Sequence, residues 1–279
     1  MKAFKEFEGK DPAFWAFIKF ISENLGYSKK NAINRFSVGE IKALCRKLNM
    51  HADDVLVEEA SKYSCCRADI LNNYVCDNLM SGEEAKEEFQ PLQQLHRISR
   101  YYCKLPMNKQ KGEMKQIAYF TAIINVIAEK TIREITGKNE RGFDDDPRSL
   151  LYMLNEKNEI IGASSRRFDG AYPETMNPRL VWEIKEYYYN TSFGSRVADG
   201  VYETQLDGHE FQEVFERTGR KVYHVLFIDS YNTWWNLGKS YLCRIVDAVN
   251  SGIVDEVIIG REVFTRWPEL LKEIVQKTE

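Results

Sequence analysis

The spacing of apolar residues changes along this chain, and that change narrows the possible folds more than any other feature. Up to about residue 105, apolar residues recur at the helical spacing of three and four positions. A long helix with the same spacing is predicted over residues 114–135. After residue 159, short extended runs alternate with helical ones. The predicted order from residue 114 is therefore helix, three strands, helix, strand, helix, strand and helix.

This order predicts an α/β fold with a mixed central sheet flanked by helices, preceded by an all-helical N-terminal region. A polar, basic stretch with Pro106 and Gly112 marks the boundary, so we expect parts over residues 1–110 and 111–279. In the first part, helices are predicted over residues 12–25, 38–48, 52–63 and 68–80. In the second part, strands are predicted over 159–164, 167–172, 180–188, 221–229 and 255–260, and helices over 201–217, 237–250 and 267–277.

The composition limits the class of protein. Of the 279 residues 43% are hydrophobic, which is enough for a core, but no apolar run approaches the roughly 18 residues of a membrane span. The first residues carry alternating charge unlike a signal peptide, so we expect a cytoplasmic protein with no membrane partner. The six cysteines contain no Cys-x-x-Cys pair, which argues against zinc. A net charge of −3 neither indicates nor excludes a nucleic-acid partner.

The strand LVWEIKEYY, residues 180–188, carries two opposite charges on one face. Successive strand side chains point to opposite sides, so Glu183 and Lys185 share a face while Trp182 and Ile184 share the other. Charges on a face covered by helices require a cleft or a strong internal pairing. Antiparallel pairing with the preceding strand would place Asp169 beside Glu183.

Two neighbouring carboxylates repel each other, and a divalent cation that prefers oxygen ligands relieves the repulsion. Mg²⁺ is commonly held by one or two carboxylates together with water and phosphate oxygens. Lys185 would then be placed to hold or deprotonate a metal-bound water aimed at phosphorus. The pattern predicts a Mg²⁺-dependent site for phosphodiester hydrolysis.

Asp169, thirteen intervening residues and then Glu183-Ile184-Lys185 resemble the signature of the PD-(D/E)XK nuclease superfamily. The resemblance covers about residues 114–260 and includes the element order of restriction endonucleases. It implies a restriction-endonuclease-like sheet, with Asp169, Glu183 and the Ile184 carbonyl as metal ligands. Lys185 would position water or act as general base. Phe168 stands where the family often has proline.

The resemblance also implies a glutamate on the first core helix near the metal, for which Glu129 and Glu113 are candidates. Basic and hydroxyl side chains beside the predicted site are candidates for binding the phosphates of nucleic acid. They are Arg166 and Arg167 before the acidic residue, and Thr191, Ser192, Ser195 and Arg196 after the strand. A merely polar loop is an equally good interpretation of the second group.

The motif is weak when taken alone. Glu-x-Lys occurs five times in the chain, beginning at Glu8, Glu40, Glu84, Glu113 and Glu183. Only the last lies in a strong strand pattern preceded at short range by Asp-Gly on another strand. The alternative is an edge strand whose Glu/Lys pair only adds solubility.

We therefore expect a Mg²⁺-dependent DNA endonuclease of the restriction type that cuts duplex DNA as a homodimer, with the N-terminal region gripping DNA, dimerising or both. A repair or recombination nuclease of the same superfamily is one alternative. The other is a non-catalytic DNA-binding protein that uses a helix-turn-helix-like stretch at residues 37–60. An ordinary helical hairpin explains that stretch at least as well.

Overall fold

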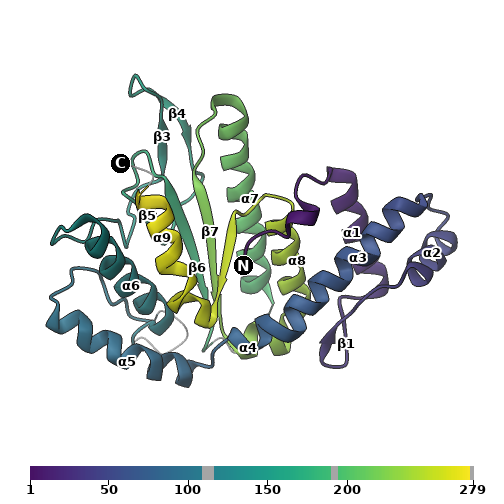
Figure 1. The fold of residues 1–279 in the computed structure, drawn as a ribbon, viewed down its shortest axis with the longest axis horizontal. Coiled ribbons are helices and arrows are strands. Elements are labelled where there is room, and N and C mark those ends of the chain that lie inside the picture. Colours follow the sequence, from purple (N-terminus) through teal and green to yellow (C-terminus); the bar gives the residue numbers. More distant parts are fainter. Residues whose placement is uncertain (109–115, 190–193, 277–279) are drawn as a thin grey trace.

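A four-stranded mixed sheet lies at the centre of the molecule (Figure 1). The computed structural model describes residues 1–108, 116–189 and 194–276, without the Ser195 side chain. In the sheet order β5-β6-β7-β8, the first pair is antiparallel and the other two pairs are parallel. The mixed α/β sheet expected from the sequence is thus confirmed. The strands are β5 (Gly170–Tyr172), β6 (Leu180–Glu186), β7 (Tyr223–Asp229) and β8 (Glu256–Ile259).

Helices cover both faces of this sheet (Figure 1). On one face, Trp182 and Phe227 pack in one apolar core with α6 (Tyr119–Thr136) and α9 (Arg266–Gln276). On the other face, Leu226 and Ile228 pack with α7 (Ser195–Thr218) and α8 (Lys239–Asn250). The two parallel pairs are joined through α7 and α8, because parallel strands need a long crossover. The alternation along β6 therefore directs Glu183 and Lys185 toward α7.

The first of the three consecutive strands lies outside the central sheet, contrary to the predicted arrangement. β4 (Ile160–Ala163) pairs instead with β3 (Tyr152–Leu154), a strand that the sequence analysis missed. The free edge of β5 is taken by Asp144, whose backbone exchanges hydrogen bonds of 2.9 and 3.0 Å with Ala171. β4 is therefore excluded from that edge. β3 has only three residues, which is too short for an alternating pattern to be seen in the sequence.

The N-terminal helices form a core of their own, with apolar side chains from all three long helices. The expectation of an all-helical region is wrong in one detail, because a hairpin of two-residue strands follows the first helix, with Lys30 at a positive φ of 56°. Such short strands leave no periodic pattern. The elements are η1 (Lys5–Phe7), α1 (Pro12–Leu25), β1 (Ser28–Lys29), β2 (Ala32–Ile33), α2 (Val38–Lys47) and α3 (Asp54–Ile70).

The predicted helices 52–63 and 68–80 are joined, since α3 continues through the π-helical turn η2 (Leu71–Val75) into α4 (Cys76–Asn78). The helix-turn-helix-like stretch corresponds to α2 and the first part of α3. α5 (Gly82–Ile98) packs in the same core as α6. The last short elements are η3 (Tyr231–Leu237) and η4 (Gly260–Phe264). Within the described ranges no helix is long and apolar enough to cross a bilayer.

A buried ion pair ties the N-terminal helices to α8. Arg67 of α3 is fully buried, and its Nη1 lies 2.9 Å from Asp247 Oδ2 while Nη2 donates to Ser22 Oγ at 3.0 Å. The Tyr63 hydroxyl donates to Asp247 Oδ1 at 2.6 Å. Burial of these polar groups is compensated only when all of them are in place.

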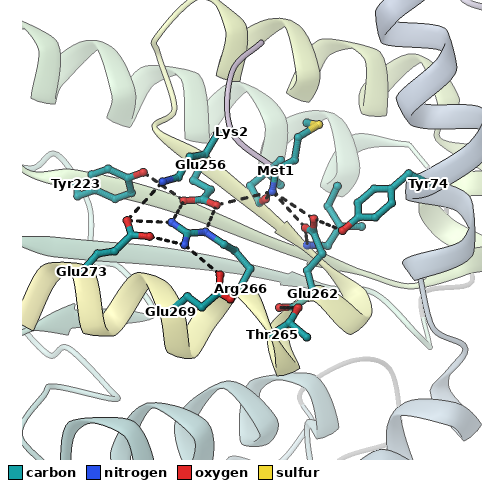
Figure 2. A network of polar contacts seen from close by, with 12 residues as sticks. Met1, Lys2, Tyr74, Tyr223, Glu256, Glu262, Thr265, Arg266, Glu269 and Glu273 are labelled. Carbon is teal, nitrogen blue, oxygen red and sulfur yellow. Dashed lines mark hydrogen bonds and ion pairs between the residues drawn. The ribbon is translucent and has the colours of Figure 1, made fainter. Parts of the chain in front are cut away.

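The first residue of the chain contacts β8 and its surroundings (Figure 2). Val257 N donates to Met1 O at 3.1 Å, so Met1 covers part of the edge of β8. The Met1 amino group lies 3.3 Å from Glu262 Oε2. Arg266 Nε lies 2.6 Å from Glu256 Oε1, and Figure 2 shows these two side chains facing each other. Two ion pairs, Met1 with Glu262 and Arg266 with Glu256, therefore lie at this end of the sheet.

The end of β7 is held by a buried carboxylate. Asp229 Oδ1 accepts hydrogen bonds from Met80 N at 2.8 Å and from Ser230 N at 2.9 Å, and Oδ2 accepts one from the Tyr188 hydroxyl. Burial raises the pKa of Asp229 to about 8. This carboxylate connects the sheet to the segment that precedes α5.

Replacing Arg67 by methionine should lower the free energy of unfolding by about 3 kcal/mol, because Asp247 is left charged and unpaired in the interior. The measurement is equilibrium urea unfolding of both proteins. Lys138→Met, at the exposed Lys138–Glu140 pair, is the control and should change little. Equal stability of Arg67→Met and the wild type would show that the pair does not hold the N-terminal helices.

Asp229→Asn should change the pH dependence of stability. The folded pKa of about 8 exceeds the unfolded value of about 3.9, so the protonated group stabilises the fold below pH 4. That contribution is lost as the pH rises through 8, on the order of 1 kcal/mol per pH unit. Urea unfolding at several pH values should show the wild type losing stability relative to Asp229→Asn between pH 4 and 8. Parallel profiles would contradict the assignment.

Candidate functional site

Asp169 lies at the edge of β6, where its pairing with β5 ends. Asp169 N donates to Trp182 O at 3.1 Å, and Asp169 Oδ2 accepts a hydrogen bond from Ile184 N at 2.7 Å. Gly170 permits this approach, since a Cβ there would be 2.0 Å from a ring carbon of Trp182. The antiparallel pairing predicted from the sequence is confirmed, and it brings Asp169 to the residue between Glu183 and Lys185.

Glu183 and Lys185 lie side by side beneath α7. They are 5% and 7% exposed, and Lys185 Nζ donates to Glu183 Oε1 at 2.7 Å. Lys185 Nζ also donates to Glu203 Oε2 of α7 at 3.2 Å. Gly200 leaves room for the lysine, because a Cβ at that position would be 3.1 Å from Lys185 Cε. The predicted shared face is confirmed, and both charges are paired.

Arg166 completes this group of charges. Its Nη2 lies 3.1 Å from Glu183 Oε2 and 2.9 Å from Asp207 Oδ2, and its Nε donates to Asp207 Oδ1 at 3.0 Å. The guanidinium also lies over the Phe168 ring, 5.4 Å from its centroid. Arg166, predicted to bind phosphates, is instead joined to the carboxylates of the site.

The sequence analysis missed the two acidic residues that α7 contributes. Glu203 and Asp207 are four positions apart, so a helix places them on the same side. That spacing lies within the predicted helix 201–217 and was the available indication. Which element this side of the helix would contact is decided only by the fold.

The titration behaviour of the site follows from desolvation and neighbouring charge. The pKa of Asp169 is raised to about 7, mainly because surrounding protein atoms desolvate its carboxyl group and secondly because Glu183 carries a like charge nearby. Part of the Asp169 side chain is nevertheless solvent-accessible. Burial raises the pKa of Asp207 to about 6 despite the Arg166 partner. Burial disfavours the charge of Lys185, but the charge of Glu183 and its hydrogen bond, together with Tyr187, raise the pKa of that lysine overall. Lys185 is thus a firmly held cation.

The donor set fits a hard divalent cation. Glu183 Oε2 is buried and makes no hydrogen bond, although Arg166 lies within ion-pair distance. Ile184 N–H points toward Asp169, and the carbonyl of the same strand residue points to the same edge. Two carboxylates and a carbonyl are oxygen ligands of the kind that Mg²⁺ takes. Groups of three or more His, Cys, Asp or Glu side chains that could hold a metal ion are absent from the part of the chain described.

Glu129 has a different place. Its buried carboxylate accepts hydrogen bonds from Tyr102 N at 2.9 Å and Cys103 N at 2.6 Å, and it pairs with Arg133. These contacts hold the segment before α6, and within the residues that the structure describes no contact joins Glu129 to Asp169, Glu183 or Lys185. The other candidate, Glu113, lies outside the described residues.

The remaining predicted phosphate-binding residues are not joined to the carboxylates by any contact within the described ranges. Arg167 is exposed directly after Arg166. Arg196 is exposed in the first turn of α7, where its carbonyl accepts a hydrogen bond from the Tyr187 hydroxyl at 3.3 Å. Thr191, Ser192 and the Ser195 side chain lie outside what the structure describes.

Family models match nearly the whole chain. One, described as Domain of unknown function (DUF7687), matches residues 80–274. The chain belongs to the DUF7687 family. A second model, Domain of unknown function (DUF7690), matches residues 1–74. The DUF7687 match includes α5 with the sheet, so the models divide the chain earlier than the predicted boundary at residue 110. Neither the curated proteins nor the solved structures contain a match to this chain.

Replacing Glu129 by glutamine should destabilise the protein and leave any Mn²⁺ binding unchanged. An amide cannot accept from Tyr102 N and Cys103 N while also pairing with Arg133, so a loss of about 1–3 kcal/mol is expected. Urea unfolding measures the loss, and calorimetric titration with Mn²⁺ measures the affinity. A fall in affinity as large as that of Glu183→Gln would instead place Glu129 among the metal ligands.

Proposed function

We propose that the protein is a Mg²⁺-dependent endonuclease of the restriction type that hydrolyses phosphodiester bonds in duplex DNA. The observation that carries the proposal is the position of Asp169 beside the stretch of β6 that holds Glu183 and Lys185: Asp169 accepts a hydrogen bond from Ile184 N, between those two residues, and Lys185 donates one to Glu183. An antiparallel pair continued by parallel strands is consistent with a restriction-endonuclease-like core. The signature spacing and this strand arrangement support the same assignment independently.

In this proposal Asp169, Glu183 and the Ile184 carbonyl would hold the metal ion. A bound divalent cation lowers the pKa of coordinated water and neutralises charge on the phosphate. The raised pKa of Lys185 favours a role in which its ammonium donates hydrogen bonds and orients water or a phosphate oxygen. Acting as general base would require this lysine to lose its proton first, which the adjacent Glu183 opposes.

The DNA partner and the dimer belong to the same proposal. The exposed Arg167 lies two positions before Asp169, and the exposed Arg196 lies in the first turn of α7, the helix that carries Glu203 and Asp207. Cationic side chains at such positions can bind phosphates. Cutting both strands of a duplex is most simply done by two related active sites, so we propose a homodimer. Light scattering of the purified protein, alone and with duplex DNA, measures the number of copies.

Asp169→Asn, Glu183→Gln and Lys185→Met should each reduce cleavage of mixed genomic DNA in Mg²⁺ by at least about 100-fold, because each removes a ligand or the orienting cation. DNA binding, measured by fluorescence anisotropy, should remain. Lys157→Met, at an exposed position in the β3–β4 turn, is the control and should cut normally. Wild-type protein that binds DNA but cuts no substrate with Mg²⁺ or Mn²⁺ would support a non-catalytic DNA-binding protein instead.

A further inference from the structure

Glu183 is bound by two cations in the structure, and they bind it differently. Lys185 Nζ donates a 2.7 Å hydrogen bond to Oε1. Arg166 donates to Oε1 at 3.2 Å and also faces Oε2, with Nη2 at 3.1 Å but without a hydrogen bond to that oxygen. Oε2 is the oxygen free to take a metal ion, and Arg166 is the cation beside it.

Arg166 is anchored away from Glu183 as well. Its Nε and Nη2 both donate to Asp207, in the two-pronged geometry that arginine forms with carboxylates. Asp207 is 1% exposed on α7, and the Phe168 ring supports the guanidinium from another side. Arg166 would therefore keep strong partners if it moved off Glu183.

We propose that Arg166, anchored by Asp207, is the resident counter-cation of Glu183 and competes with the divalent metal for this carboxylate. The proposal rests on the metal site of the proposed function and assigns Arg166 as a positioning residue that sets metal affinity. It removes Arg166 from the group of phosphate-binding residues expected from the sequence.

The competition follows from the distances. A divalent cation bound at Glu183 Oε2 would meet the positive charge of Arg166 about 3 Å from that oxygen, and like charges so close repel strongly in a half-buried setting. The guanidinium must withdraw toward Asp207 for the ion to bind. Lys185, which holds the other oxygen, keeps Glu183 in place meanwhile.

Arg166→Met should therefore bind Mn²⁺ about tenfold more tightly than the wild type, measured by isothermal titration calorimetry without DNA. Arg166→Lys keeps the charge and should stay near the wild-type affinity. Arg217→Met, which removes an exposed arginine in the last turn of α7, is the control and should leave the affinity unchanged.

A second variant guards against misfolding, because Arg166→Met leaves Asp207 buried without its partner. The double variant Arg166→Met with Asp207→Asn leaves the net charge of the cluster unchanged. It should still bind Mn²⁺ more tightly than the wild type, since the removed cation lies directly beside Glu183. Thermal unfolding with and without Mn²⁺ gives an independent readout of the same affinity.

Unchanged or weaker Mn²⁺ binding by the folded variants would overturn this inference and make Arg166 a support for Glu183. If that result accompanies wild-type binding that Glu183→Gln abolishes, the metal site of the proposed function stands. If neither the wild type nor Arg166→Met takes up Mn²⁺ at this carboxylate, both the proposed metal site and the competition are overturned.

Discussion

The hydrogen bond from Ile184 N to Asp169 Oδ2 is the contact on which the candidate site depends. β5 pairs with β6 only as far as Trp182, so the next free N–H on that edge is bonded by a side chain instead of a strand. This places one carboxylate at the strand edge, while Glu183 and Lys185 project from the strand toward α7. Both groups are fixed by the backbone of a central strand, which is more rigid than a loop.

Buried charge is the second constraint. Glu183 and Lys185 lie on a covered face of the sheet, where apolar residues are usual, and such buried charges are tolerated only when they are paired. Two carboxylates from α7 and one arginine supply the remaining partners. The result is an alternating cluster in which Lys185 joins Glu183 to Glu203, and Arg166 joins Glu183 to Asp207. If Glu183 binds a metal ion as proposed, the same pairing also controls the access of that cation to the carboxylate.

The rest of the chain holds this sheet in position. The N-terminal helices have their own core and reach α8 through Arg67, while Met80 reaches the end of β7 through Asp229. The Arg67–Asp247 pair joins the parts matched by the two family models, residues 1–74 and 80–274, whereas Met80 and Asp229 both lie in the second part. The division in sequence is therefore bridged by buried polar contacts in space.

The sequence by itself determined which segments form helices and strands wherever the apolar residues have a clear period, and it determined which residues of β6 share a face. Val181, Glu183 and Lys185 must share one side of a strand, because alternation is a local property of extended backbone. It also identified Asp169, since Asp-Gly on the preceding strand lies within reach of an antiparallel partner. The three-residue β3 and the two-residue hairpin strands were not predicted, because strands this short show no alternating pattern of apolar and polar residues.

Only the tertiary structure decided the partners of these charges. Arg166 and Asp207 are 41 positions apart, and nothing local distinguishes an arginine that binds a carboxylate from one that binds phosphate. Glu129 lay on the expected helix, yet its carboxylate is taken by the backbone of Tyr102 and Cys103. The pairing of side chains distant in sequence depends on how helices pack on the sheet, and that packing is a property of the whole chain.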